Sequence, residues 1–162
     1  MNTIRKTRQT DIDRLMEIYH SAQERMIAGG NPNQWGHAYP PRKIVEDDIR
    51  NGNSFVLEEG EDIHAVFVMM DSPEPSYQVI DGAWLNDAKY VTIHRVARDN
   101  TAHGIFSQIM EFCRKHADNI RIDTHHDNHI MQAAIEKAGF SRCGIIRLAD
   151  GSPRIAYQWN AN

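Results

Sequence analysis

The chain has 162 residues, with 18 lysines and arginines against 22 aspartates and glutamates, and a formal net charge of −4. This length suits one domain spanning residues 1–162, which can bury a core without disulfide or metal support. Hydrophobic residues make up 41% and charged residues 25%, a balance that excludes disordered and collagen-like classes. The basic residues are scattered, so we expect no nucleic-acid partner.

The cysteines and the hydropathy pattern predict a compartment. Cys113 and Cys143 each lie within an apolar pattern, which indicates buried thiols in a reducing environment rather than a disulfide framework. Residues 1–6 show no apolar leader, and no stretch approaches the ~20 apolar residues of a membrane span. We therefore expect a cytoplasmic protein that does not bind membranes.

The first third of the chain predicts a strand and two helices. Residues 3–7 read as a strand, and Thr10 with Asp13 resembles a capping box that starts a helix ending near Ala28. A loop rich in glycine, proline and aromatic residues precedes a shorter helix, which starts at about Arg42. Apolar residues at helical spacing give each helix a buried face, with Ile12, Leu15, Met16, Tyr19, Ala22 and Met26 in one and Ile44, Val45 and Ile49 in the other.

The middle of the chain predicts a hairpin, an irregular segment and a long strand. Residues 54–58 and 63–70 flank a glycine-containing turn, which favours an antiparallel hairpin. Residues 71–86 contain two prolines and an Asp-Gly pair, so we expect an irregular excursion with one short strand. Residues 90–97 form a strand rich in β-branched side chains.

The last third alternates helices and strands. We expect a helix over 104–117, a strand over 120–124, a helix capped by Asp127 or Asn128 that stops at Gly139, and a closing hairpin. The order of elements is that of a mixed α/β fold.

The segment from the strand over 90–97 into the helix that opens at Gly104 carries the clearest chemical signal. A glycine at a helix N-terminus lets a phosphate group approach the first N–H groups of the helix, whose dipole favours anions. His103 can add positive charge there. Taken alone the signal is weak, because many such junctions bind nothing.

Several motifs resemble the GNAT superfamily of acyl-CoA-dependent N-acetyltransferases. They are the strand His94-Arg95-Val96-Ala97, the opening Gly104-Ile105-x-Ser107, and the run Glu136-Lys137-Ala138-Gly139-Phe140. Further similarity, to a bacterial branch of the superfamily, extends along nearly the whole chain. The resemblance implies an α/β fold with a mixed, mostly antiparallel sheet, splayed to admit CoA and flanked by about four helices. It also implies acetyl-CoA as cosubstrate, no metal, and a small-molecule or peptide amine as acceptor, and it leaves a homodimer open.

The resemblance implies a CoA site at the same junction. The backbone at the end of the strand would pair with the pantetheine arm, the following loop would cradle the pyrophosphate, and the next helix would add one contact. The residues so implied are Val96, Ala97, Arg98, Ala102, His103, Gly104, Ile105, Phe106 and Asn128. The loop is about two residues shorter than is common, and Asp99 stands where the family has Gln or Arg. A carboxylate pointing at the pyrophosphate would oppose binding.

Amine acetylation needs a base and an oxyanion donor, because an alkyl amine is mostly protonated at pH 7. Val96 is the candidate N–H donor, and His94 and Asp81 are the preferred candidate bases, with Glu24 and His125 as alternatives. Many members carry a tyrosine acid where this chain has Ile135. Tyr157 is a distant substitute for that acid.

The acceptor side is expected to include Gln34, Trp35, Tyr39, Trp84 and His125. The two tryptophans can equally be core aromatics. The run from His125 to His129 has metal-ligand residue types but lacks their helical spacing, so we expect no metal there. Two other functions stay open, which are a CoA-binding sensor or interaction module with impaired catalysis, and a histidine-dependent metal protein.

Overall fold

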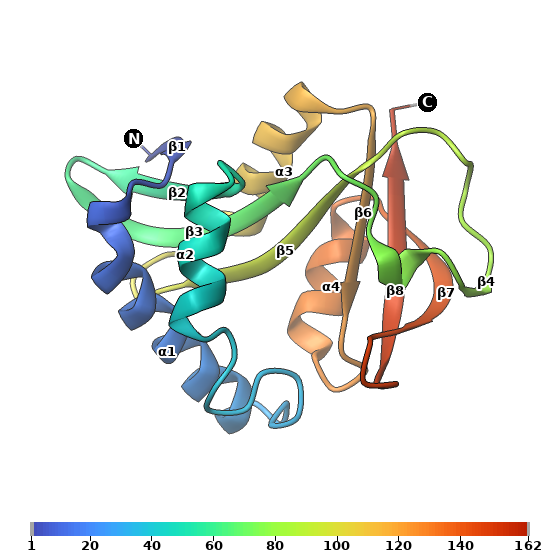
Figure 1. The fold of residues 1–162 in the computed structure, drawn as a ribbon, viewed down its shortest axis with the longest axis horizontal. Helices are drawn as coiled ribbons and strands as arrows, with labels where there is room; N and C mark the ends of the chain where they lie inside the picture. Colours follow the sequence, from blue (N-terminus) through green and yellow to red (C-terminus); the bar gives the residue numbers. More distant parts are fainter. Residues whose placement is uncertain (1, 162) are drawn as a thin grey trace. The chain divides into compact units, whose positions relative to one another are not determined.

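The computed structural model describes residues 2–161 and contains both helices and strands (Figure 1). The described helices are α1 (Ile12–Ala28), α2 (Arg42–Arg50), α3 (Ile105–His116) and α4 (His129–Lys137). The strands are β1 (Asn2–Lys6), β2 (Ser54–Glu59), β3 (Asp62–Met70), β4 (Asp81–Gly82), β5 (Val91–Arg98), β6 (Asn119–Thr124), β7 (Ser141–Arg147) and β8 (Pro153–Asn160). Most pairs are antiparallel and β5–β6 is parallel. The expected mixed α/β fold with a mostly antiparallel sheet is confirmed.

The residues group into two compact units that share β5 and α3. The first contains the chain up to Met69 together with His94–Ile105, and the second contains Met70–Ile93 and the chain from Phe106 onward. In hydrogen-bonded order the strands run β1-β2-β3-β5 in the first unit and β5-β6-β8-β7-β4 in the second. We describe each unit separately.

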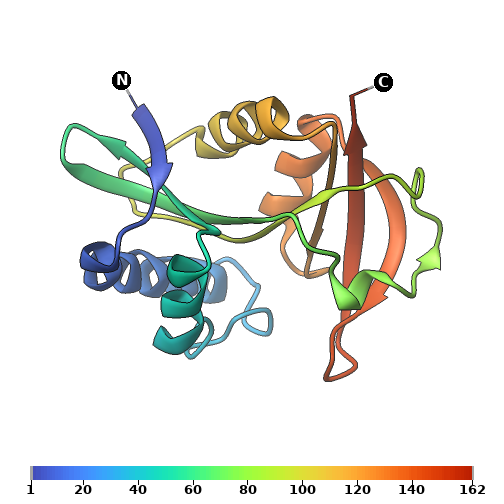
Figure 2. The same ribbon diagram turned by 45° about the horizontal axis from the view of Figure 1, so that its top comes forward.

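In the first unit, α1 and α2 cover one face of the strands β1 to β3 (Figure 2). Residues at helical spacing on α1 meet residues of α2, β2, β3 and β5 in one hydrophobic cluster. Its buried members are Leu15, Ile18, Tyr19, Ala22, Val45, Ile49, Val56, Ile63, Val66 and Ala97. Ala97 of β5 belongs to this cluster, so the packing of α1 and α2 fixes the strand that leads into the candidate site.

In the second unit, the irregular segment 71–90 packs on β6, β7 and β8. The Arg121 guanidinium lies between the rings of Trp84 and Tyr90, 4.0 and 4.1 Å from their centroids. Tyr77 is buried and its hydroxyl donates to the Asp123 carboxylate at 2.6 Å. These contacts tie an excursion with little secondary structure to a regular sheet.

The pairing of β4 with β7 requires glycine at two facing positions. Gly82 lies opposite Gly144, and their φ angles are 131° and 151°. A Cβ atom on Gly82 would lie 2.2 Å from the Cys143 carbonyl oxygen, and one on Gly144 would lie 2.1 Å from that of Asp81. The close approach of the two backbones therefore positions Asp81 beside Ile145 of β7.

Most sequence-predicted elements are present within one or two residues of their expected bounds, including the short strand in the excursion. The predicted cap of the first helix is wrong. A 3₁₀ turn over Gln9–Asp11 precedes α1, and the Asp11 carboxylate accepts the Arg8 N–H at 2.7 Å, so Thr10 and Asp13 form no capping box. The Asn128 side chain caps α4 through the Met131 N–H, as expected. Within residues 2–161, no helix is long and apolar enough to cross a membrane.

Candidate functional site

Strand β5 contains one residue in the left-handed backbone conformation, Arg95. Among the described residues other than glycine, Arg95 is the one with a positive φ, at 49°. Its guanidinium forms two hydrogen bonds with the Asp48 carboxylate of α2, at 2.6 and 2.7 Å, and donates to the Tyr39 hydroxyl at 3.0 Å. Burial lowers the pKa of Arg95, but the hydrogen bonds to Asp48 and Tyr39 outweigh it and raise the pKa above its usual value. The buried ion pair thus holds the strained residue in place.

Loop 99–102, which follows β5, is organised by one carboxylate. Oδ1 of Asp99 accepts the Thr101 N–H, the Thr101 hydroxyl and the Ala102 N–H, at 2.9, 2.7 and 3.1 Å. Oδ2 accepts from Arg14 of α1 at 2.7 Å and lies 2.8 Å from Nδ1 of His64 in β3. Burial raises the pKa of Asp99, but these hydrogen bonds and charges outweigh it and lower the pKa to about 2. The carboxylate is therefore ionised at neutral pH and already compensated.

Gly104 is the last residue before α3. Its φ of 65° is a left-handed conformation that residues with a side chain adopt only with strain. A Cβ atom built at this position would meet no atom within 4 Å. The first turn of α3 contains no acidic residue. No side chain at position 104 therefore stands in front of the first N–H groups of α3.

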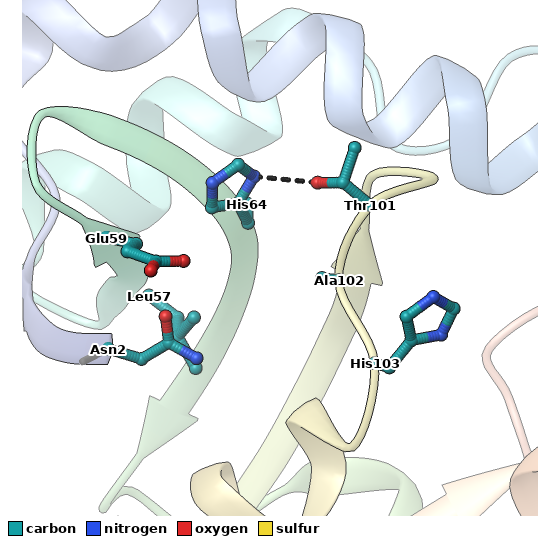
Figure 3. Close-up of a pocket in the computed structure, with 7 residues that line it drawn as sticks. All are labelled: Asn2, Leu57, Glu59, His64, Thr101, Ala102 and His103. Carbon is teal, nitrogen blue, oxygen red and sulfur yellow. Dashed lines mark hydrogen bonds between the residues drawn. The ribbon is translucent and has the colours of Figure 1, made fainter.

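A cavity of about 450 Å³ lies beside this loop in the first unit (Figure 3). Figure 3 shows His64 and Thr101 facing each other, with His103 further along the loop. The lining combines two imidazoles, a carboxylate, an amide and a hydroxyl with apolar groups, from Asn2, Leu57, Glu59, His64, Thr101, Ala102 and His103. Two predicted CoA-site residues, Ala102 and His103, share this cavity.

The strand end and loop hold the other predicted CoA residues of the first unit. Val96 and Arg98 are half-buried and Ala97 is buried. The Arg98 carbonyl accepts from Arg25 of α1, and the Arg98 side chain bonds back to the carbonyls of Asp99 and Ala102. The guanidinium is therefore engaged by the loop's own backbone. Ile105, the first residue of α3, is buried, while Phe106 is half-buried at the start of the second unit's part of α3.

Three predicted acceptor-side residues come together in the loop between α1 and α2. The ring centroid of Trp35 lies 6.1 Å from that of Tyr39 and 5.8 Å from that of Tyr19. Gln34 is half-buried and accepts from the Asn31 amide at 2.8 Å. The Gln23 amide donates to the Tyr39 carbonyl at 2.7 Å. Tyr39, whose hydroxyl accepts from Arg95, thus joins this loop to the Arg95 ion pair.

The candidate bases lie in different surroundings. His94 is half-buried on β5, in the first unit. Asp81 is exposed on β4, in the second unit. Glu24 is exposed on α1 and pairs with His20 at 2.9 Å. His125 is buried, and burial, together with the charge of Arg154, lowers its pKa.

The remaining predicted residues of the second unit have structural contacts. Trp84 packs against Tyr77, donates its indole N–H to the Tyr77 carbonyl at 3.0 Å and stacks on Arg121. Trp84 is half-buried, so part of its side chain stays exposed beside these contacts. Ile135 is fully buried, and the Tyr157 hydroxyl donates to Glu136 at 3.3 Å.

One histidine-rich cluster brings metal-ligand atoms near one another. Ligand atoms of His125, His126 and Asp127 lie within 4.8 Å of one another. Nδ1 of His125, however, accepts the Asp127 N–H at 3.0 Å, which occupies that lone pair. A neutral His125 therefore carries its proton on Nε2.

The residues that organise the first unit's site include several that sequence reasoning missed. The sequence does indicate a role for Asp48, because it lies between Val45 and Ile49 on the buried face of α2. A buried carboxylate there needs a cation as its partner. Arg95 as that cation had no local signal, because the two residues are 47 positions apart. Arg14 and His64 likewise reach Asp99 only through the tertiary fold.

Comparison with solved structures identifies relatives of the whole chain, whereas no family model and no curated protein matches it. A GNAT-family acetyltransferase from Streptococcus agalactiae is 30% identical with a TM-score of 0.90, and the match covers 99% of this chain and 96% of that one. A GNAT-family acetyltransferase from Listeria monocytogenes is 16% identical, with a TM-score of 0.72 and coverages of 98% and 94%. The ribosomal-protein-S18-alanine N-acetyltransferase from Escherichia coli is 18% identical, with a TM-score of 0.66 and coverages of 100% and 95%. The last two show the fold alone. The identity to the streptococcal protein over nearly the full length of both chains, together with the motifs and the β5–α3 junction, shows that this chain belongs to the GNAT acetyltransferase family.

Proposed function

We propose that the chain transfers an acetyl group from acetyl-CoA to the primary amine of a small molecule or peptide, by direct attack of the neutral amine on the thioester. Family membership supports acetyl transfer, and the motifs along the chain support acetyl-CoA as the donor. The observation that carries the proposal is the junction where the loop held by Asp99 passes through Gly104 into α3.

The residues at this junction fit an anionic phosphate group. The N-terminal turn of α3 offers N–H groups at the positive end of a helix, without an acidic residue to oppose an anion. We assign the pyrophosphate to the backbone of Gly104, Ile105 and Phe106, with His103 beside them. The Ala102 N–H already donates to Asp99, so Ala102 serves as part of the loop wall rather than as a donor.

For the pantetheine arm we assign the backbone of Val96, Ala97 and Arg98 at the end of β5. Asn128 keeps its cap on α4, and we propose an additional contact from Asn128 to the same arm. No metal enters the proposed reaction.

In the proposed reaction, acetyl-CoA supplies an acetyl group activated as a thioester. The Val96 N–H donates to the carbonyl oxygen as negative charge develops on it. His94 or Asp81 accepts the proton that the attacking alkylammonium must lose. Ile135 has no proton to give, so we infer that the thiol leaves with water as its proton source, helped by a pKa far below that of an alcohol.

We propose that the acceptor contacts Gln34, Trp35 and Tyr39 in the first unit. Trp35 and Tyr39 offer aromatic faces, which attract a cationic amine before it loses its proton. Trp84 and His125 are our candidates on the second unit.

A panel of primary amines, monitored by release of free CoA thiol, tests the proposal. We expect turnover with at least one amine, and we expect His94→Ala or Asp81→Asn to lower kcat at least tenfold with the Kd for CoA unchanged. His20→Ala, on an exposed face of α1, is the matched control for His94 and should leave both values unchanged. Tight CoA binding with no thiol release across the panel would instead favour a binding module without catalysis.

A further inference from the structure

The Asp99 carboxylate accepts hydrogen bonds on both of its oxygens, and its partners come from different parts of the chain. Oδ1 binds the backbone of Thr101 and Ala102 and the Thr101 hydroxyl, all within its own loop. Oδ2 binds Arg14 of α1 and lies against His64 of β3. One side chain therefore joins the loop before α3 to a helix and a strand of the first unit.

Residues of α1 and β3 also bind the backbone around this loop. The Asp99 N–H donates to the His64 carbonyl at 2.9 Å. Arg25 of α1 donates to the Asn100 side chain at 2.7 Å and to the Arg98 carbonyl. Side chains of α1 and the backbone of β3 thus hold the strand end and loop over 98–102.

The orientation of the Asp99 carboxylate decides whether its charge would oppose a bound phosphate. An acidic residue in this loop opposes a phosphate only if its carboxylate points toward that phosphate. Here both oxygens face N–H and O–H donors of the protein, and the cation of Arg14 compensates their charge. Asp99 is only 9% exposed. The charge that appears unfavourable in the sequence is used as a structural anchor.

We propose that Asp99 is a positioning residue for CoA, which holds the loop over 99–102 in the conformation that presents Gly104 and the first turn of α3 to the pyrophosphate. This inference rests on the proposed function. A loop that is already ordered loses less conformational entropy when the phosphate binds, so affinity rises without a direct contact. The effect belongs to CoA affinity rather than to the acetyl-transfer step.

The first test needs no ligand. Amide hydrogen exchange is measured at Thr101 and Ala102 in wild-type protein and in Asp99→Ala. We expect at least tenfold faster exchange in the variant at both amides, because each donates its N–H to Asp99. Unchanged exchange at both amides would overturn the anchoring role, whatever the ligand of the site.

The second test measures CoA binding by calorimetry and steady-state kinetics. For Asp99→Ala we expect the Kd for CoA and the KM for acetyl-CoA to rise about tenfold, with kcat and the KM for the amine within twofold of wild type. Thr101→Val, which removes one of the bonds to Oδ1, should give a smaller rise of the same kind and serves where Asp99→Ala folds poorly.

The control is Asp11→Ala. Asp11 also pairs with an arginine, Arg5, and accepts a backbone N–H, but it lies before α1 and outside the loop. It should lower the stability of the protein without changing the Kd for CoA. Equal CoA affinity in wild type and Asp99→Ala, or a loss confined to kcat, would overturn the positioning role. Failure of wild type itself to bind CoA would overturn the proposed function and leave the exchange result standing.

Discussion

Replacing Asp48 by alanine should strongly destabilise the protein, because it leaves the buried cation of Arg95 without its carboxylate. The side chains of Arg95 and Asp48 are only 13% and 9% exposed, and two hydrogen bonds of 2.6 and 2.7 Å join them. Breaking such a pair from one side typically costs about 3–5 kcal/mol, most of it the penalty of an uncompensated buried charge. For a chain of this length that is a drop in Tm of roughly 6–20 °C.

Urea unfolding followed by circular dichroism measures this loss. The double variant Asp48→Ala/Arg95→Met should recover a large part of the stability, since it removes the orphaned cation as well. Glu46→Ala on the same helix is the control, because its pair with Arg42 is exposed and should contribute little to stability. A loss below about 1 kcal/mol for Asp48→Ala, or a double variant no more stable than the single one, would refute the reasoning.

Three further predictions concern stability, reactivity and pH. Arg121→Met should lower the free energy of unfolding by about 1–2 kcal/mol in thermal or urea melts, because it removes the guanidinium that contacts the rings of Trp84 and Tyr90. An unchanged free energy of unfolding would contradict a stabilising cation–π role for Arg121. Burial raises the pKa of the Cys113 thiol to about 12, so iodoacetamide at pH 8 should alkylate it at least 100-fold more slowly than free cysteine until denaturant is added. The pKa of Asp99 is about 2 in the folded state and ~3.9 when unfolded, so its contribution of about 2 kcal/mol is complete above pH 5 and is lost as the pH falls from 4 to 2. Acid titration of the unfolding free energy should therefore be shallower in Asp99→Asn, and identical slopes would contradict the assignment.

The sequence predicted the features that depend on neighbouring residues. Helical spacing in α1, the Asn128 cap of α4 and the turn signals of both hairpins are local, and the structure confirms them. The predicted Thr10–Asp13 cap of α1 was wrong because the Asp11 side chain accepts the Arg8 N–H and a 3₁₀ turn precedes the helix.

The features that the sequence could not predict depend on distant partners. Asp99 appeared to oppose an anion, because nothing in its neighbourhood indicates that Arg14, 85 positions away, neutralises it. The sequence left Trp84 open between the acceptor wall and the core, and its contact with Arg121, 37 positions away, is visible only in the folded chain. The site roles, the single domain, the cytoplasmic location and a homodimer stay predictions.

The most direct test of the proposed CoA chemistry is equilibrium binding of acetyl-CoA by calorimetry, in wild type and in Gly104→Asp. We expect saturable binding by wild type. In the variant we expect a Kd at least 100-fold higher, because a carboxylate then stands before α3 and a side chain is forced to a φ of 65°. No heat and no thermal shift for wild type at millimolar acetyl-CoA would contradict the proposed function, and wild-type affinity in Gly104→Asp would show that the phosphates bind elsewhere.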